Sequence, residues 1–180
     1  AARLNEAVAQ HQAGQLAAAD SIYQDILRLE PRNPDALHLS GVIALQTERF
    51  EAAHDLIGRA IAINPSVPLY HRNMGITLEA LELGDEALVH FTKAIELEPD
   101  NIENHLRLAH AMDNADRSAN AAQSFRNAVK AGADDAETHT FLAVALTKNQ
   151  EVYEAGRHFA LALQRAPHAA FANSNMGRFH

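Results

Sequence analysis

The segment from residue 84 to residue 99 reads GDEALVHFTKAIELEP, and it decides the fold. In it the small Ala87 is followed four positions later by the large Phe91, then by Ala94 and finally by Pro99. Small residues allow two helices to approach closely, and a large residue one turn away fills the gap beside them. Proline lacks a backbone N–H and clashes with the preceding turn, so a helix is expected to end just before Pro99.

The same pattern recurs at every thirty-fourth position of the chain. The closing prolines are Pro31, Pro65, Pro99 and Pro167, with Ala133 at the one missing place. Twelve positions before these places stand Ala19, Ala53, Ala87, Ala121 and Ala155. Eight before them stand Tyr23, Ile57, Phe91, Phe125 and Phe159. Five before them stand Ile26, Ala60, Ala94, Ala128 and Ala162, and twenty-four before them stand Ala7, Gly41, Gly75, Ala109 and Ala143. A fixed period of this length predicts a stack of repeated helical hairpins.

The start of the second hairpin is marked by Asn33 and Pro34. Asparagine is a favoured N-cap residue, and proline fits the first helical position because its missing N–H is not needed there. We therefore expect a helix to begin at Pro34.

This pattern of small, small, aromatic, small and proline positions resembles the tetratricopeptide repeat, over the whole chain. The resemblance implies an all-α fold, a right-handed superhelical solenoid of antiparallel helix pairs. We expect one domain over residues 1–180. Its repeats are expected at residues 1–33, 34–67, 68–101, 102–135 and 136–169, with a partial sixth at 170–180.

The composition of the chain indicates which classes of partner it can bind and where in the cell it can be located. The formal net charge is -8, with 15 basic side chains scattered among 23 acidic ones, which argues against nucleic acid as a partner. The longest apolar run, Phe141 to Leu146, is too short to span a membrane. The absence of Cys excludes disulfides and fits either cytoplasm or periplasm. We expect a cytoplasmic location, with the periplasm left open.

The resemblance also implies where a ligand binds. In this family the concave surface comes from the first helix of each repeat, and such surfaces bind peptides. Carried over position by position, the peptide-binding groove comprises Leu4, Val8, His38, Val42, Leu45, Leu69, Arg72, Asn73, Ile76, Glu79, Glu103, Arg107, His110 and Val144. Asp35, Asp113 and Glu137 add acidic groups to the same face, and Lys148 adds a basic one.

An apolar strip edged with carboxylates suits an amphipathic or extended peptide that carries Lys or Arg. The partner is therefore expected to be a protein or peptide of this kind. The alternative is that Val8, Val42, Ile76 and Val144 only support packing between neighbouring helices, because isolated exposed apolar residues are ordinary.

One subtype of the family holds the terminal carboxylate of chaperones with a clamp of basic and amide side chains. Asn73 and Arg107 match that clamp, but His38, Val42 and Glu103 replace expected basic or amide residues. Glu103 would repel the carboxylate, so we do not expect a chaperone tail as the ligand.

His71, His105 and His139 recur at the same position of three successive repeats. Equivalent positions on adjacent helices lie about 8 to 10 Å apart, too far for a shared metal ion. We therefore expect no metal or other cofactor, and expect each of these histidines to fill a packing position with one ring nitrogen hydrogen-bonded to backbone. A stack that gains charge near pH 6 is the alternative.

Motifs of catalysis are missing: the sequence has no Gly-rich phosphate loop, no Gly-x-Ser-x-Gly, no His-Glu-x-x-His and no Cys. We therefore expect no enzymatic activity in the array and no catalytic residue.

Two other functions stay open. Residues 36–44 and 70–75 are similar to stretches in bacterial proteins that place such repeats before an O-GlcNAc-type or other transferase, which would make the array a substrate-recruiting arm. The matching asparagine ladder is broken, because Leu39, Arg107 and Phe141 interrupt Asn5, Asn73 and Asn175. The other alternative is a self-assembling scaffold, with contacts through uncapped ends at Phe171 and Phe179.

Overall fold

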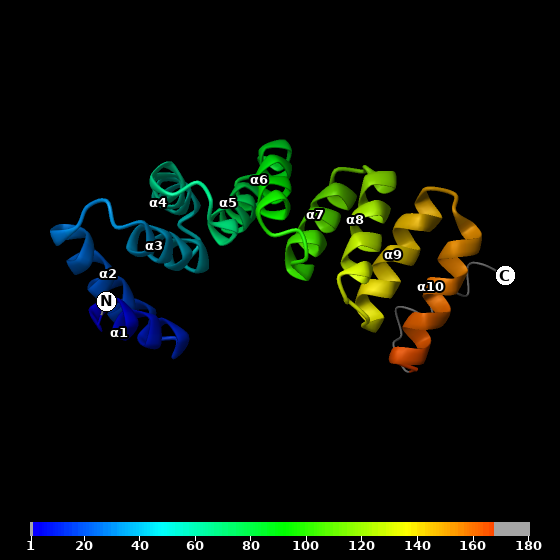
Figure 1. The fold of residues 1–180 in the computed structure, drawn as a ribbon, viewed down its shortest axis with the longest axis horizontal. Coiled ribbons are helices and arrows are strands. Elements are labelled where there is room, and N and C mark those ends of the chain that lie inside the picture. Colours follow the sequence, from blue (N-terminus) through cyan, green and yellow to red (C-terminus); the bar gives the residue numbers. More distant parts are fainter. Residues whose placement is uncertain (1, 168–180) are drawn as a thin grey trace. The chain divides into compact units, whose positions relative to one another are not determined.

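The computed structural model describes residues 2–167, and every regular element in that range is an α-helix. The helices are shown in Figure 1 and run in the order α1 (Ala2–Gln12), α2 (Leu16–Leu29), α3 (Pro34–Gln46), α4 (Phe50–Ile63), α5 (Pro68–Ala80), α6 (Gly84–Leu97), α7 (Ile102–Asn114), α8 (Ser118–Lys130), α9 (Ala136–Lys148) and α10 (Val152–Arg165). A short turn reverses the chain within each hairpin.

The chain divides into two compact units, and each packs its helices in sequence order. Unit 1, residues 1–97, contains the hairpins α1–α2, α3–α4 and α5–α6, with α2 against α3 and α4 against α5. Unit 2, residues 98–180, contains the hairpins α7–α8 and α9–α10, with α8 against α9. The expected all-α stack of antiparallel helix pairs is confirmed. The extent of a single domain over 1–180 stays a prediction, and the partial sixth repeat at 170–180 lies outside the described residues.

The small residues of the repeat are the points where the two helices of a hairpin touch. A Cβ atom added at Gly75 would lie 2.5 Å from Cε1 of Phe91, and one added at Gly41 would lie 2.6 Å from Cγ1 of Ile57. Phe91 and Ile57 are fully buried. The large residue that follows the alanine of each second helix therefore packs onto the backbone of the first helix, as the spacing predicts.

Three of the first helices, α3, α7 and α9, begin at capped positions. The side chain of Asn33 accepts a hydrogen bond from the Ala36 N–H at 3.0 Å, and Pro34 follows it, as expected from the sequence. Asn101 and Asp135 cap α7 and α9 in the same way. Each of these caps satisfies one of the backbone donors that a helix start leaves without a partner.

Candidate functional site

The first helices of unit 1, α1, α3 and α5, carry an apolar stripe at one repeat position. The stripe consists of Val8, Val42 and Ile76, which hold the same place in three successive repeats and are only partly buried. Three further apolar side chains from the predicted groove lie on the same helices, and all keep some exposure: Leu4, Leu45 and Leu69. Leu69 is the most open of these, at 40% exposed.

Hydrogen bonds between side chains join neighbouring first helices of unit 1. The ring Nε2 of His11 lies 2.9 Å from Oε1 of Gln46, which connects α1 to α3. The Tyr70 hydroxyl donates to Oδ1 of Asp35 at 2.6 Å, connecting α5 to α3. These hydrogen bonds join the first helices that carry the stripe. Neighbouring first helices are therefore held together by polar contacts as well as by apolar ones.

His38 is the most enclosed of the predicted groove residues. Its side chain is 3% exposed and its ring is stacked on Tyr70 with centroids 4.5 Å apart. Nδ2 of Asn73 lies 2.8 Å from His38 Nε2. Burial lowers the pKa of His38 to about 4, and the charge of Arg72 acts in the same direction, so the ring is neutral at physiological pH.

In unit 2 the predicted groove residues are tied to neighbours. Glu103 and Arg107 form an ion pair of 3.7 Å on one face of α7. The ring of His110 meets Phe125 and Phe141 edge-on, with centroids 5.1 and 4.6 Å away. Burial lowers the pKa of His110.

The remaining groove residue of unit 2, Val144 on α9, is partly buried and packs against the core of its unit. Beside it, Lys148 donates to Oδ1 of Asp113 at 2.6 Å, joining α9 to α7. The arrangement repeats that of unit 1, in which polar pairs bridge successive first helices.

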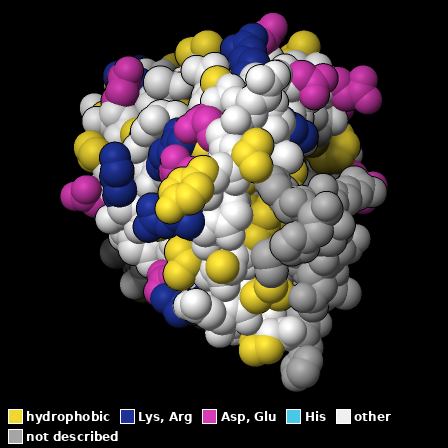
Figure 2. Space-filling model, turned by 90° about the vertical axis from the view of Figure 1, so that its right-hand side faces the viewer, with side chains coloured by type: hydrophobic (Ala, Val, Ile, Leu, Met, Phe, Trp, Pro, Cys, Tyr) yellow, Lys and Arg dark blue, Asp and Glu magenta, His cyan; other side chains and the backbone are white. Residues whose placement is uncertain are grey.

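Several charged groups of this face already have partners within the protein. Arg72 and Glu79 also make interactions with neighbouring groups. A ligand on this face would therefore meet apolar side chains and shared charges rather than a set of free ions. Figure 2 views the protein from the right-hand side of Figure 1, and on that side acidic and basic side chains are intermixed, with apolar ones between them.

The recurring histidines fill packing positions, as predicted. The ring Nε2 of His71 donates to the Pro65 carbonyl oxygen at 2.9 Å, and that of His105 donates to the Pro99 carbonyl oxygen at 2.7 Å. His139 differs, because its Nε2 donates to the carboxylate of Asp134 at 2.9 Å instead of to backbone. The expected hydrogen bond to backbone is confirmed for His71 and His105. It is wrong for His139, because the carboxylate of Asp134 accepts the hydrogen bond from that ring.

Two histidines on second helices were missed by the sequence reasoning. Nδ1 of His90 lies 3.1 Å from Nδ1 of His71, and Nδ1 of His158 lies 3.0 Å from Nδ1 of His139. The signal was present, because His90 and His158 are separated by twice the repeat period. Between residues 2 and 167 the structure contains no group of three or more His, Cys, Asp or Glu side chains arranged to hold a metal ion.

The length and polarity of the helices bear on membrane insertion. Within the part of the chain that the structure describes, no helix combines the length and apolar character that crossing a membrane requires.

Known families and curated proteins include relatives of this sequence. Residues 10–74 match a family model described as tetratricopeptide repeat. Over 114 residues the chain is 31% identical to cellulose synthase 2 operon protein C of Komagataeibacter xylinus, a match that covers 62% of this chain and 9% of that protein. The chain therefore spans a small part of the length of this relative.

Several solved structures share the fold. YrrB, described as a TPR protein with an unusual peptide-binding site, superposes with a TM-score of 0.83 at 18% identity, covering 97% of this chain and 90% of YrrB. A fragment of MamA from Desulfovibrio magneticus superposes with a TM-score of 0.82 at 15% identity, covering 93% of this chain and 95% of that one. Residues 10–74 thus match the tetratricopeptide repeat, and the stacked helix hairpins of the described residues have the fold of solved tetratricopeptide-repeat proteins.

Proposed function

We propose that the first-helix face of unit 1 binds an extended or amphipathic peptide segment of a protein partner, and that the array itself is non-catalytic. The observation that carries this proposal is the apolar stripe of Val8, Val42 and Ile76, which keeps partial exposure on three successive first helices. A run of equivalent apolar positions offers contacts at regular intervals along an elongated ligand.

The partner segment is expected to carry Lys or Arg beside its apolar residues. The protein has a net charge of -8, so a basic segment is attracted toward it at long range. Near the stripe, the carboxylates of Asp35 and Glu79 have protein partners and would serve as shared acceptors rather than as free ions. We therefore expect charge to set the association rate and the apolar contacts to set the lifetime of the complex.

The other predicted groove residues take supporting roles in this proposal. Leu4, Leu45 and Leu69 widen the apolar surface, whereas His38, Arg72 and Asn73 position the helices under it. In unit 2 the corresponding set is Glu103, Arg107, His110 and Val144, which would form a contact surface of that unit by itself.

The test is affinity capture with the chain as bait, comparing wild type with a Val42→Glu/Ile76→Glu double variant. Two carboxylates in the stripe would have to be buried without a partner when an apolar segment binds, which is unfavourable. The matched control is Val89→Glu, because Val89 on α6 is 68% exposed and lies outside the predicted groove. Circular dichroism establishes that all three proteins keep their helices.

A protein captured by wild type and by Val89→Glu, but lost from the double variant, supports the assigned face. The same set of captured proteins from all three baits contradicts it.

A second role follows from the length of the relative from Komagataeibacter xylinus, of which the matched stretch is 9%. The matched stretch is there part of a much longer protein, so we propose as an alternative that the array is a recruiting arm beside other domains, including those of a transferase. The full reading frame around the chain tests this directly. Self-assembly through Phe171 and Phe179 stays a prediction, since both residues lie outside the described range; concentration-dependent mass measurements test it.

A further inference from the structure

In the α9–α10 hairpin of unit 2, an aspartate binds an arginine at the end of α10. Nε of Arg165 donates to Oδ1 of Asp134 at 3.1 Å, and Nη2 donates to Oδ2 at 2.6 Å. The fork of the guanidinium thus meets both carboxylate oxygens, the geometry that distinguishes arginine from lysine. His139 Nε2 donates to the same carboxylate at 2.9 Å, which leaves Asp134 with three donors.

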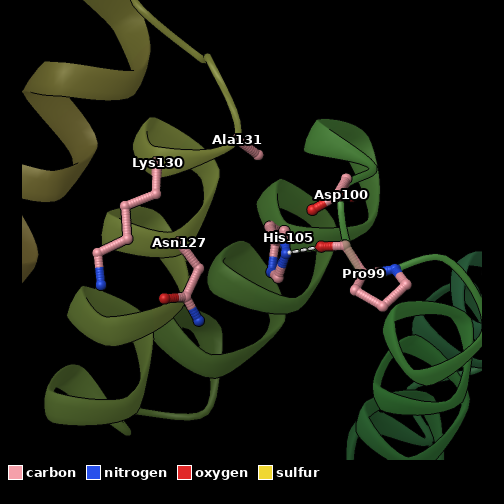
Figure 3. Close-up of a pocket in the computed structure, with 6 residues that line it drawn as sticks. All are labelled: Pro99, Asp100, His105, Asn127, Lys130 and Ala131. Atoms are coloured by element: carbon pink, nitrogen blue, oxygen red, sulfur yellow. Dashed lines mark hydrogen bonds between the residues drawn. The ribbon is translucent and has the colours of Figure 1, made fainter.

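One repeat earlier the same places form a pocket. Asp100, His105 and Ala131 stand one repeat period before Asp134, His139 and Arg165 in the sequence. Ala131 thus stands where the next repeat has Arg165, so the long side chain is missing. A cavity of about 290 Å³ lies at this place. We call it the Asp100 pocket; it is lined by Pro99, Asp100, His105, Asn127, Lys130 and Ala131 (Figure 3).

The carboxylate of Asp100 lacks the protein partner that its counterpart has. Among the described residues, no hydrogen bond or ion pair engages this carboxylate. Figure 3 shows Asp100 and Ala131 facing each other across the pocket, while the Lys130 side chain extends along α8 away from Asp100. The pocket therefore has an anionic wall where its counterpart in the next repeat holds a guanidinium.

The rest of the lining is polar and already ordered. His105 is 7% exposed, and its Nε2 bond to the Pro99 carbonyl oxygen fixes the ring against the pocket. The amide oxygen of Asn127 accepts a hydrogen bond from Nε2 of Gln123 at 3.1 Å and retains a second lone pair. A donor entering the pocket would thus find acceptors without a rearrangement of the helices.

We propose that the Asp100 pocket binds the guanidinium of an arginine side chain from a protein partner, in the manner in which Asp134 binds Arg165. The volume lies at the lower end of the range for ligand pockets, which suits one inserted side chain rather than a larger organic molecule. None of its lining residues belongs to the predicted peptide groove, so the pocket is a second contact point that does not depend on the first.

The probe for this site is Nα-acetyl-arginine methylamide, titrated into the ¹⁵N-labelled chain and followed by NMR. Saturable shifts are expected at the amides of Asp100, Asn127 and Ala131. The lysine and citrulline analogues are expected to bind at least about tenfold more weakly, because they lack the charged fork.

Four variants make the result specific. Asp100→Asn removes the charge and should abolish the saturable shifts, and Ala131→Arg should abolish them by filling the pocket from within. Lys130→Gln copies the Gln164 of the next repeat and should leave binding equal or tighter. Asp134→Asn is the matched control and should leave probe binding intact.

The proposal is overturned if arginine and lysine probes bind equally, if Asp100→Asn binds like wild type, or if Lys130→Gln loses binding. Saturation confined to the arginine probe and lost in Asp100→Asn and Ala131→Arg supports it.

Discussion

The Nδ1 atoms of His71 and His90 lie 3.1 Å apart, and this contact fixes how the two rings hold their protons. His71 Nε2 must carry hydrogen, since it donates to the Pro65 carbonyl oxygen at 2.9 Å. In the neutral pair its Nδ1 is therefore a lone pair, and His90 must donate from Nδ1. A proton added to His71 at Nδ1 would place two N–H groups against each other and break this hydrogen bond.

The same pair recurs two repeats later as His139 and His158, and it predicts a loss of stability in mild acid. The pKa of both His90 and His158 is lowered. Burial is the larger cause, and the charge of the neighbouring histidine is the next. Because the folded pKa lies below the unfolded value of about 6.5, the unfolded chain binds more protons as pH falls. The stability due to these groups is thus complete well above pH 6.5 and decreases as the pH falls through about that value.

Urea unfolding at pH 7.5 and pH 5.5 measures this loss. A His90→Ser/His158→Ser variant is expected to be less stable than wild type at pH 7.5, by about 1 kcal/mol per lost hydrogen bond. Its unfolding free energy should fall less between the two pH values. Parallel pH dependence in both proteins would show that the pairs are not responsible. His38, whose pKa is about 4, accounts for part of the loss that both proteins share.

Ser124→His is expected to stabilise the protein. Ser124 occupies in the fourth repeat the place of His90 and His158, and the buried Nδ1 of His105 opposite it has no hydrogen-bond partner among the described residues. A histidine donating from its own Nδ1 would satisfy that lone pair, raising the unfolding free energy by about 1 kcal/mol at pH 7.5. Thermal unfolding detects the change, and a lower melting temperature would mean that the site cannot admit the ring.

Gly75→Ala is expected to be destabilising by about 1 to 3 kcal/mol, because its Cβ would overlap the ring of Phe91. The control is Gly156→Ala in α10, where no atom lies within 4 Å of the added Cβ. There the gain in helix propensity should stabilise by up to about 1 kcal/mol. Denaturant unfolding of both variants compares them; equal effects would contradict the role given to close helix approach.

The turn inside each hairpin places one residue in the left-handed region. Gly14, Glu48, Glu82, Asp116 and Gln150 all have positive φ and hold the same place in the five repeats. This conformation costs a residue with a side chain about 1 to 2 kcal/mol relative to the right-handed one, and glycine adopts it freely.

Glu82→Gly should therefore raise the unfolding free energy by up to about 1 kcal/mol, while Gly14→Ala should lower it by a similar amount. Gly14 has no atom within 4 Å of an added Cβ, so strain alone would act there. Calorimetric melting of the two variants is the measurement, and shifts of the same sign would refute the explanation.

The sequence predicted the helical hairpins well because packing determines their pattern. Gly75 and Phe91 must face each other wherever two helices cross closely, so their spacing appears directly as a period. The cap at Asn33 was equally readable, since it depends on neighbours along the chain.

Contacts between side chains of different helices were harder to predict. The pairing of His38 with Asn73 and of His71 with His90 depends on rotamers and on helix rotation, which a period does not specify. The Asp100 pocket depends on one missing side chain, Ala131 in place of an arginine, and is visible only once Asp134 and Arg165 are seen in contact.

The most direct test of the peptide-binding face is photo-crosslinking from single positions. A benzoyl-phenylalanine at Leu45 or Leu69 lies on the proposed face, whereas one at Val89 lies on α6 outside it. Partner protein captured from the source cells should crosslink from the first two positions and not from the third. Crosslinks formed equally from Val89, or from Val89 alone, would contradict the assignment of the first-helix face as the binding surface.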